Sequence, residues 1–231
     1  MNELLWLGFV LLDMTLVVLI FRYFGKPGLF ALVVFNLILC NIQVLKLVDL
    51  FGVSTTLGNV LYASVFLSTN LLVEFYGPKA GQKAVALGFC TLLMACAYMQ
   101  ISLYFTPAAQ DFAQPHLEAI FGFLPRLALA SLAAYLCGQL LNVFLFAWLK
   151  RKSKGRWLWL RNLSSSLSAQ ALDSVVFVAI AFSGVFSMEV LWQIFITTFI
   201  VKAVVIVFDT PFFYLARHML RKHPPEDIQT K

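Results

Sequence analysis

The sequence predicts an all-α polytopic membrane protein with seven transmembrane helices, because three observations agree. Of the 231 residues, 61% are hydrophobic and 12% are charged, whereas a soluble domain carries about 25% charged residues. Seven apolar runs each reach the roughly 20 residues that a helix needs to cross the hydrocarbon core of a bilayer. Lysine and arginine gather in alternate loops between these runs. We therefore expect one transmembrane domain over residues 1–231, with no room for a large soluble domain.

The apolar runs are joined by mostly short connections. They cover Leu4–Tyr23, Leu29–Val48, Thr56–Tyr76, Ala84–Phe105, Leu124–Leu149, Leu163–Ser183 and Val190–Leu215. The first run is preceded by Glu3 instead of a basic segment, and Arg22 and Lys26 follow it instead of a small-residue cleavage site. It is therefore predicted to be a true first helix and not a cleaved signal peptide.

The distribution of basic residues predicts the orientation of the chain. Fourteen Lys and Arg residues follow the first, third, fifth and seventh runs, and only Lys46 and Arg126 lie near helix ends on the other side. Loops rich in Lys and Arg stay in the cytoplasm. The N-terminus is therefore expected outside and the C-terminus in the cytoplasm. The alternation over all seven runs also supports their number.

Polar side chains inside four of the runs predict a cavity that binds a solute, since lipid cannot satisfy them and they must face protein or water. The predicted site consists of Asn70, Glu74, Gln139, Asn142, Gln170, Asp173, Lys202 and Asp209. Asn70 and Glu74 are four residues apart and share a helix face. Gly138, on the fifth run, allows a neighbouring helix to approach closely.

An alternative reading needs no solute. Each charge inside the membrane costs about 2.5–3.5 kcal/mol on insertion scales, so Asp173 and Lys202 could instead be a structural pair that joins the sixth and seventh helices. The amides of Gln139 and Asn142 favour the binding site, because a structural pair needs no amides beside it. Asp13 stands alone in the middle of the first run, where it either pairs with another helix or lines a pore.

Several other classes of protein are not indicated. GxSxG, HExxH and phosphate-binding loop motifs are all missing from the sequence, so we expect neither an enzyme nor a cofactor. The four cysteines lie in apolar runs without a CxxC pair and are predicted to be small buried residues. The net charge of +6 does not predict nucleic-acid binding, because the cations sit in short loops where they set topology.

Four segments stand in order along the chain: Thr69–Gly77, Ala134–Asn142, Ser164–Phe182 and Lys202–Tyr214. Together they resemble the bacterial queuosine-precursor transporters of the vitamin uptake transporter group. The resemblance covers about residues 29–220 and implies a six-helix core similar to the S-components of energy-coupling-factor transporters. The helix at residues 4–23 would be an addition to that core. Two departures from the family pattern are Asn70, where some members have an acid, and Asp173-Ser174, where Asp-Thr is commoner.

The resemblance implies import across the bacterial inner membrane of 7-cyano-7-deazaguanine, its aminomethyl derivative, or both. The donors on the guanine-type edge match a carboxylate, Asp173 or Glu74, and the carbonyl oxygen matches a donor such as Lys202. Another small planar vitamin-like or nucleobase solute, or a membrane scaffold, is the alternative. Import would be facilitated, with trapping by downstream metabolism, or coupled to protons, with Asp173, Glu74 or Asp209 as carrier, or driven by an ATP-dependent module on which the chain docks. A homodimer is also compatible with the sequence.

Overall fold

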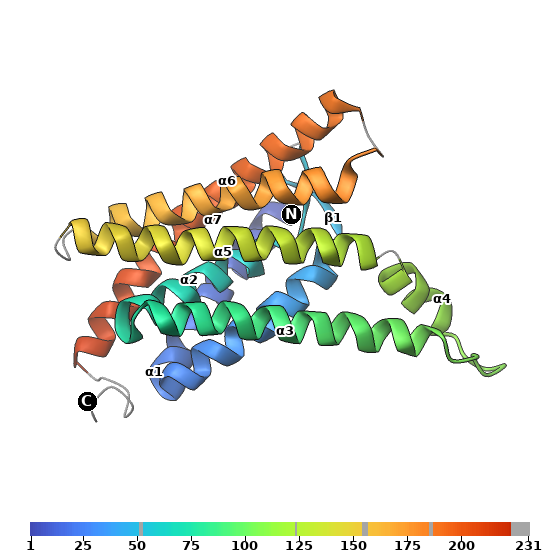
Figure 1. The fold of residues 1–231 in the computed structure, drawn as a ribbon, viewed down its shortest axis with the longest axis horizontal. Coiled ribbons are helices and arrows are strands. Elements are labelled where there is room, and N and C mark those ends of the chain that lie inside the picture. The colour runs from blue at the N-terminus through green and yellow to red at the C-terminus, as the bar shows by residue number, and fades with distance from the viewer. Residues whose placement is uncertain (51–52, 123, 154–156, 185–186, 223–231) are drawn as a thin grey trace.

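The computed structural model describes residues 1–231 apart from 51–52, 123, 154–156, 185–186 and 223–231, and leaves out the side chains of some helical residues, Asp209 among them. Helices account for most of the described chain (Figure 1). The elements are α1 (Asn2–Gln43), β1 (Leu47–Leu50), β2 (Val53–Thr56), α2 (Asn59–Tyr76), α3 (Pro78–Leu103), α4 (Gln114–Leu117), η1 (Glu118–Gly122), α5 (Leu124–Lys152), α6 (Leu158–Phe182) and α7 (Met188–Lys222).

Helix α1 is two helical arms joined at Gly25. Gly25 has φ 56° and ψ −137°, a combination that is essentially restricted to glycine because a Cβ atom clashes there. The first two apolar runs are thus the arms at residues 2–24 and 26–43. The Asn36 amide on the second arm donates a hydrogen bond to Asp13 on the first over 3.4 Å. Since the two residues lie at similar distances from Gly25 along the chain, the arms run side by side in opposite directions.

A short antiparallel hairpin follows α1, which the sequence analysis did not predict. Strand β1 pairs with β2 in a register that sets Leu47 opposite Thr56 and Leu50 opposite Val53. The predicted second run ended at Val48, which lies in β1, and the predicted third run began at Thr56, which lies in β2. Both boundaries therefore fall in the hairpin and not in a helix. Val and Thr favour strands because branching at Cβ suits a pleated backbone, and the hydropathy of the segment hid this preference.

Several helix ends also differ from the predicted boundaries. Helix α2 ends at Tyr76 and is capped by Gly77 (φ 87°). Pro78 then begins α3 six residues before the predicted start, because proline is favoured in the first helical turn. Helices α6 and α7 also begin before their predicted runs. The connection from α3 to α5 holds α4 and the π-helical turn η1. Before α4, the Asp111 carboxylate accepts the backbone N–H of Ala113 over 2.7 Å.

Helix α2 lies inside the bundle. It packs against α1, α3, α5 and α7, and every residue from Asn59 to Val73 is buried. A hydrophobic core that includes residues from Trp6 to Ala216 surrounds it. Polar side chains from Asn59 to Val73 are therefore enclosed by the protein.

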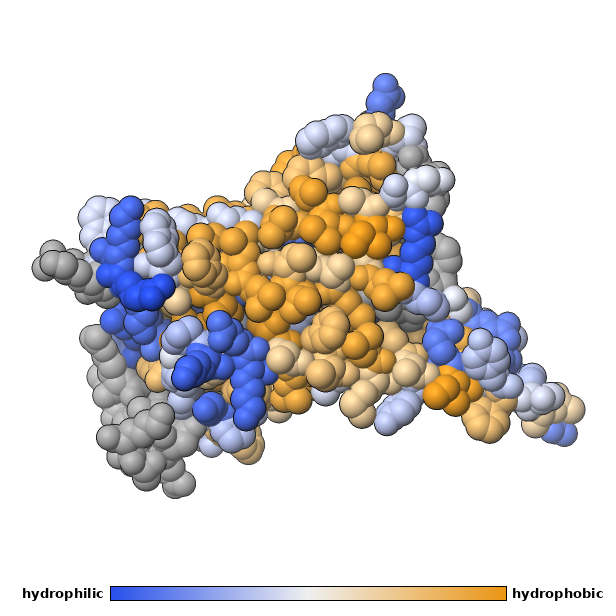
Figure 2. Space-filling view, viewed as in Figure 1, coloured by the Kyte–Doolittle hydropathy of each residue, from blue (hydrophilic) through white to orange (hydrophobic). Residues whose placement is uncertain are grey.

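The outer surface has the pattern of a membrane-embedded protein. Figure 2 shows a broad hydrophobic band across the middle of one face, with hydrophilic residues gathered toward its two ends. Large apolar side chains such as Leu12, Phe35, Leu129 and Phe144 are exposed. Cys90 and Cys137 are exposed as well, against the prediction, while Cys40 is buried; a thiol is apolar enough to stand on such a surface.

Four of the described helices are long and apolar enough to cross a membrane: Asn2–Gln43, Pro78–Leu103, Leu129–Lys152 and Leu158–Phe182. The prediction of a helical membrane protein is thereby confirmed. Helix α2 does not join this group, because a helix enclosed by other helices can carry many polar residues. The number of crossings and the direction of the chain remain predictions.

Replacing Gly25 should destabilise the turn between the two arms of α1. We expect Gly25→Ala to lower the free energy of unfolding by about 1–3 kcal/mol, because alanine strains this backbone conformation. Gly8→Ala is the matched control, since Gly8 lies in the same helix with no atom within 4 Å of the added Cβ. Thermal unfolding of the purified protein in detergent measures both. Equal midpoints for the two variants would contradict the assignment.

Candidate functional site

The central contact of the bundle joins α2, α6 and α7. The Lys202 ammonium on α7 donates a hydrogen bond to Oδ2 of Asp173 on α6. The Tyr62 hydroxyl on α2 donates to Asp173 Oδ1 over 2.5 Å. The Lys202 nitrogen also lies 4.8 Å from the centroid of the Tyr62 ring, a cation–π distance. Asp173 and Lys202 are only 2% and 6% exposed, so each charge is neutralised where water does not reach it.

Gln139 and Gln170 are the unusual residues of the site. Both are completely buried, and neither the nitrogen nor the oxygen of either side-chain amide has a hydrogen-bond partner among the described residues. A buried polar group without a partner costs about 1–3 kcal/mol, so buried amides in folded proteins are normally paired. The hydroxyls of Tyr135, four residues before Gln139, and of Ser174, four residues after Gln170, also have no hydrogen-bond partner among the described residues.

Close packing of α5 on α6 sets the depth of these amides. A Cβ atom on Gly138 would lie 3.0 Å from the Asp173 Cβ and 3.2 Å from the Ala169 carbonyl oxygen. Gln139 and Gln170 each directly follow one of these contacting residues, so they lie at the depth of Asp173. The Tyr135 ring packs against the Tyr62 ring with centroids 6.2 Å apart. We define the central polar cluster as Tyr62, Tyr135, Gln139, Gln170, Asp173 and Lys202.

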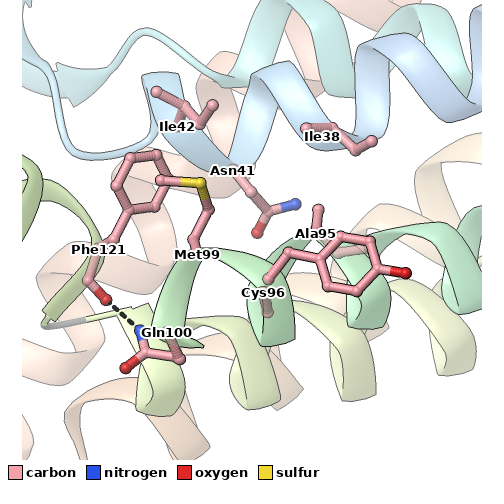
Figure 3. A pocket seen from close by; sticks show the side chains of 10 residues that line it. Ile38, Asn41, Ile42, Ala95, Cys96, Met99, Gln100 and Phe121 are labelled. Carbon is pink, nitrogen blue, oxygen red and sulfur yellow. Dashed lines mark hydrogen bonds between the residues drawn. The ribbon is translucent and has the colours of Figure 1, made fainter. Parts of the chain in front are cut away.

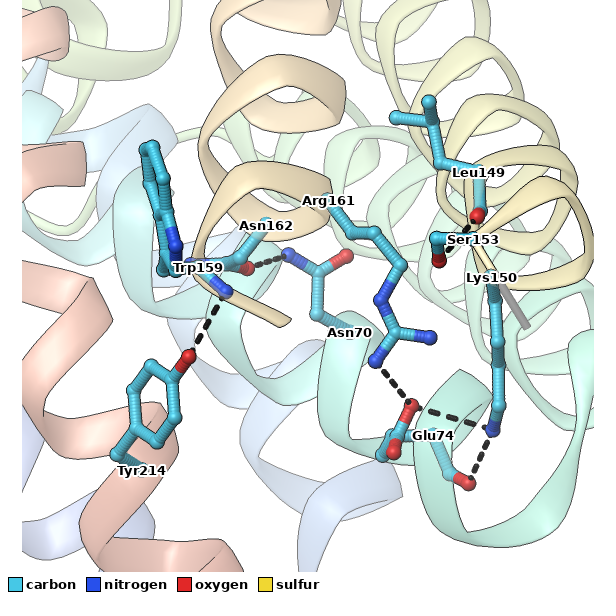
Figure 4. Close-up of polar contacts among 9 residues, drawn as sticks. All are labelled: Asn70, Glu74, Leu149, Lys150, Ser153, Trp159, Arg161, Asn162 and Tyr214. Carbon is cyan, nitrogen blue, oxygen red and sulfur yellow. Dashed lines mark hydrogen bonds and ion pairs between the residues drawn. The ribbon is translucent and has the colours of Figure 1, made fainter. Parts of the chain in front are cut away.

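A second polar group, the amide chain, links α2 to α5 and α6. Asn142 donates to the Asn70 side-chain oxygen over 2.8 Å. The Asn70 amide in turn donates to Asn162 over 2.6 Å and to Ser166 over 3.2 Å. Figure 4 shows the Asn70 side chain directed at Asn162. The structure thus brings the predicted residues Asn70 and Asn142 together, but their hydrogen bonds go to other side chains of the protein.

Glu74 is likewise engaged within the protein. Its carboxylate lies 3.1 Å from the Lys150 nitrogen and 3.5 Å from the nearest Arg161 nitrogen, and Lys150 also donates to the Glu74 carbonyl oxygen over 2.9 Å. Figure 4 shows both basic side chains directed toward Glu74. Arg161, which sequence reasoning counted only as a loop cation, is 1% exposed and lies over the Phe146 ring. We call Glu74, Lys150 and Arg161 the Glu74 cluster.

Sequence reasoning missed Tyr62, Tyr135, Asn162 and the burial of Arg161. A tyrosine inside an apolar run was the available signal, because a buried hydroxyl usually needs a partner. Asp209, the remaining predicted residue, lies on α7, but its side chain is outside the described part of the structure. No group of three His, Cys, Asp or Glu side chains suited to a metal ion occurs among the described residues.

A separate cavity of about 280 Å³ lies between α1, α3 and η1. Figure 3 shows that its wall is mostly apolar, with Ile38, Ile42 and Met99 among the lining residues. Its polar groups are few: the amides of Asn41 and Gln100 and the hydroxyl of Tyr98. The Gln100 amide donates to the Phe121 carbonyl oxygen over 2.5 Å. The cavity contains none of the predicted site residues, and such a wall offers few groups that could orient a polar planar solute.

The helices and the central polar cluster are typical of a multi-pass membrane protein that keeps polar side chains buried between its helices, an arrangement that small-solute transporters use. Residues 56–216 match the family described as "putative vitamin uptake transporter". The chain belongs to this family, which confirms the resemblance stated from the sequence. As a member of this family, it is a transporter of the bacterial inner membrane and not an enzyme.

Named relatives agree with the family. A "Probable queuosine precursor transporter" of Bacillus subtilis (strain 168) is 42% identical over 220 residues, which cover 95% of this chain and 96% of that protein. The "Queuosine precursor transporter" of Escherichia coli (strain K12) is 32% identical over 205 residues, covering 84% of this chain and 89% of that protein. No solved structure matches the chain significantly.

The contact between Asp173 and Lys202 should be worth much more than a surface ion pair. Lys202→Met leaves a buried carboxylate without its cation, and we expect it to cost about 3–5 kcal/mol. In the double variant Asp173→Leu/Lys202→Met most of this loss should return, since replacing a whole buried pair with apolar groups is often neutral. Thermal unfolding in detergent measures both variants.

The control is Lys150→Met. The Lys150 side chain, which is paired with Glu74, is 36% exposed. Ion pairs at the surface contribute only about 0–1 kcal/mol to the free energy of unfolding. If Lys202→Met destabilised the protein no more than Lys150→Met, the central pair would not hold α6 and α7 together.

Proposed function

We propose that this chain imports 7-deazaguanine precursors of queuosine, with 7-cyano-7-deazaguanine and its aminomethyl derivative as candidate substrates. The relatives named above carry this activity in their names. The observation that carries the proposal is that the amides of Gln139 and Gln170 are completely buried and have no hydrogen-bond partner among the described residues, on the turns of α5 and α6 that pack together at Gly138 and Asp173. A bound solute with several donors and acceptors would give these amides the hydrogen bonds that the described protein does not provide.

The chemistry of the central polar cluster suits a guanine-type edge. Each glutamine amide offers two N–H donors and a carbonyl acceptor, which match the ring N–H, the exocyclic amine and the carbonyl of the base. Asp173 would accept from the base as a charged acceptor, which strengthens a hydrogen bond. Lys202 would hold that carboxylate or donate to the base carbonyl. The Tyr135 ring would lie against the flat bicycle, since aromatic rings pack well in offset stacks.

The other predicted site residues divide into two groups. Asn70, Asn142 and Glu74 stay predictions as binding residues, and their hydrogen bonds and ion pairs favour a role in holding α2 against α5 and α6. These contacts would have to open for a solute to pass that end of the bundle. Asp209 stays a predicted member of the site.

We further propose that one domain crosses the bilayer seven times, with the N-terminus outside and the C-terminus in the cytoplasm. The Gly25 turn and the antiparallel contact between its arms support two crossings for α1. Helices α2, α3, α5, α6 and α7 would supply the other five. The distribution of Lys and Arg supports the direction, and the continuous hydrophobic core from Trp6 to Ala216 supports a single domain.

Labelling of single cysteines tests this topology. In a background without the four native cysteines, Thr106→Cys should react with a membrane-impermeant maleimide in intact cells, because the proposal places it outside. Ser153→Cys should react only after the membrane is permeabilised. The reverse pattern would contradict the orientation, and labelling of both from one side would contradict the number of crossings.

The decisive experiment is uptake in a bacterium that cannot make the precursor. With the gene present and 7-cyano-7-deazaguanine in the medium, we expect queuosine to appear in tRNA. Gln139→Leu and Gln170→Leu should each reduce this uptake at least tenfold. They should leave the unfolding midpoint unchanged or raise it, because an apolar side chain of similar size removes an unpaired buried amide.

Asn70→Leu is the stability control for this pair. It breaks three side-chain hydrogen bonds, so it should lower the unfolding midpoint. Normal queuosine levels in both glutamine variants would contradict the proposed site. Purified protein without saturable binding of any deazaguanine would instead support the scaffold alternative.

The predicted source of energy is a proton gradient or an ATP-driven module of the kind that the S-component resemblance implies, unless the chain is a facilitator whose solute is trapped by metabolism. A second copy of the chain is a further candidate partner. Liposomes that contain only this chain distinguish a gradient from an ATP-driven module, because the ATP-driven partner is missing there. Accumulation of solute in such liposomes would therefore require a gradient.

A further inference from the structure

A second buried polar cluster lies on the side of α2 away from the central polar cluster. Asp13 is 6% exposed in the first arm of α1. Its Oδ1 accepts a hydrogen bond from the Asn36 amide, and the same amide donates to the Ser64 hydroxyl over 2.6 Å. Its Oδ2 is buried and has no hydrogen-bond partner among the described residues. Neither this carboxyl group nor its partners belong to the solute site proposed above.

No cation is paired with Asp13 in the described structure, whose ion pairs do not include it. Helix α1 packs against β1, α2, α3 and α7, so their ionisable groups are the ones to consider. On the two arms of α1, Glu3 lies ten residues before Asp13, and Lys26 lies ten residues before Asn36. On α2, Glu74 lies ten residues after Ser64. Ten residues of helix are about 15 Å long, so none of these three charges is at the level of the Asp13 carboxylate.

The remaining ionisable groups on these elements have other surroundings. Tyr62 and Lys202 are both bonded to Asp173. The Cys40 thiol contacts the Leu37 carbonyl oxygen. On β1, Asp49 is exposed, and on α3, Lys79, Lys83, Cys90 and Tyr98 are exposed, while Cys96 is half-buried. Arg217 and His218 lie near the far end of α7, and the side chain of Asp209 is outside the described part.

The donors around Asp13 decide which ligand its free oxygen can take. A sodium ion needs several oxygen ligands, but the group of Asn36 that faces Asp13 is its N–H donor. The Ser64 hydroxyl already donates to the Leu61 carbonyl oxygen over 2.8 Å and accepts from Asn36. A buried carboxylate without a cation partner is strongly disfavoured. The ligand that fits is a proton on Oδ2.

Helix α2 connects this carboxyl group to the central polar cluster. Ser64 and Tyr62 are two residues apart, so they lie about 3 Å apart along the helix axis and point to different faces. One face meets Asn36 and Asp13, and the other meets Asp173. A change of charge at Asp13 therefore acts on the same turn of α2 that contacts the solute site.

We propose that Asp13 is a proton-binding site that couples solute import to the pH gradient. The proposal rests on the proposed function, since it requires a transported solute. The other carboxylates considered as carriers are less suited, because Asp173 is paired with Lys202, and Glu74 with Lys150 and Arg161. Asp13 also lies outside residues 56–216, the part that matches the family, so family membership assigns it no role.

Liposomes that contain only the full-length chain test the coupling. The membrane potential is held at zero with potassium and valinomycin, and labelled 7-cyano-7-deazaguanine is outside. With one proton per neutral solute, an acidic exterior should concentrate the solute about tenfold per pH unit. Asp13→Asn should still exchange labelled for unlabelled solute but should not concentrate it. Glu189→Gln, an exposed acid at the start of α7, is the matched control and should behave like the unmodified chain.

Several results would overturn the proposal. Normal accumulation by Asp13→Asn would show that another group carries the proton, and loss only in Asp209→Asn would name that group. Accumulation driven by a sodium gradient at equal pH would replace the proton with sodium. Unmodified chain that exchanges no solute at all would instead contradict the proposed function.

A measurement on the unmodified chain alone covers the case in which Asp13→Asn does not fold. Liposomes loaded with a pH-sensitive dye start with equal pH on both sides and solute only outside. Entry of the solute should acidify the lumen, with one proton for each solute molecule. Solute entry without acidification would overturn the proposal regardless of any variant.

Discussion

The buried Asp173 carboxylate, held by the Lys202 ammonium and the Tyr62 hydroxyl, is the contact on which the centre of the bundle depends. Its three residues come from α6, α7 and α2, and no single helix could bear its charge alone in a bilayer. A charge in such surroundings is tolerated only with a partner of opposite sign and further hydrogen bonds. This requirement orients α2, α6 and α7 relative to one another, and Gly138 lets α5 approach the same point.

Helix α2 carries polar groups that form hydrogen bonds with α1, α5 and α6. Its residues meet Asn36 on one face, Asp173 on another, and the amide chain about two turns further along. The side chains of the amide chain and of the Glu74 cluster each make at least one hydrogen bond or ion pair within the protein, although some of their atoms, such as Asn142 Oδ1 and Asn162 Nδ2, have no partner among the described residues. The amides of Gln139 and Gln170, by contrast, have no partner for either atom there. The unpaired amides therefore mark the part of the interior that is built for something other than packing.

Much of this arrangement could be read from residue types and spacing. A carboxylate and an ammonium inside two consecutive apolar runs required a partner, and the structure pairs Asp173 with Lys202 as the structural alternative described. That pairing does not remove the case for a binding site, because Gln139 and Gln170 are still without partners. The roles of Asn70 and Glu74 could not be separated from sequence, because a side chain bonded to its neighbours and one free to meet a solute have the same spacing on a helix.

The sequence by itself determined the class of protein, the apolar segments and the residues that lipid could not satisfy. These follow from composition and hydropathy, because the energetic demand of a bilayer acts on each segment separately. Only the tertiary structure decided which polar groups meet. It joined Asp13 to Asn36 across the Gly25 turn, brought Arg161 to Glu74, and left Gln139 and Gln170 without partners. Such contacts depend on the rotation and depth of each helix against its neighbours, which the periodicity of a single helix does not contain.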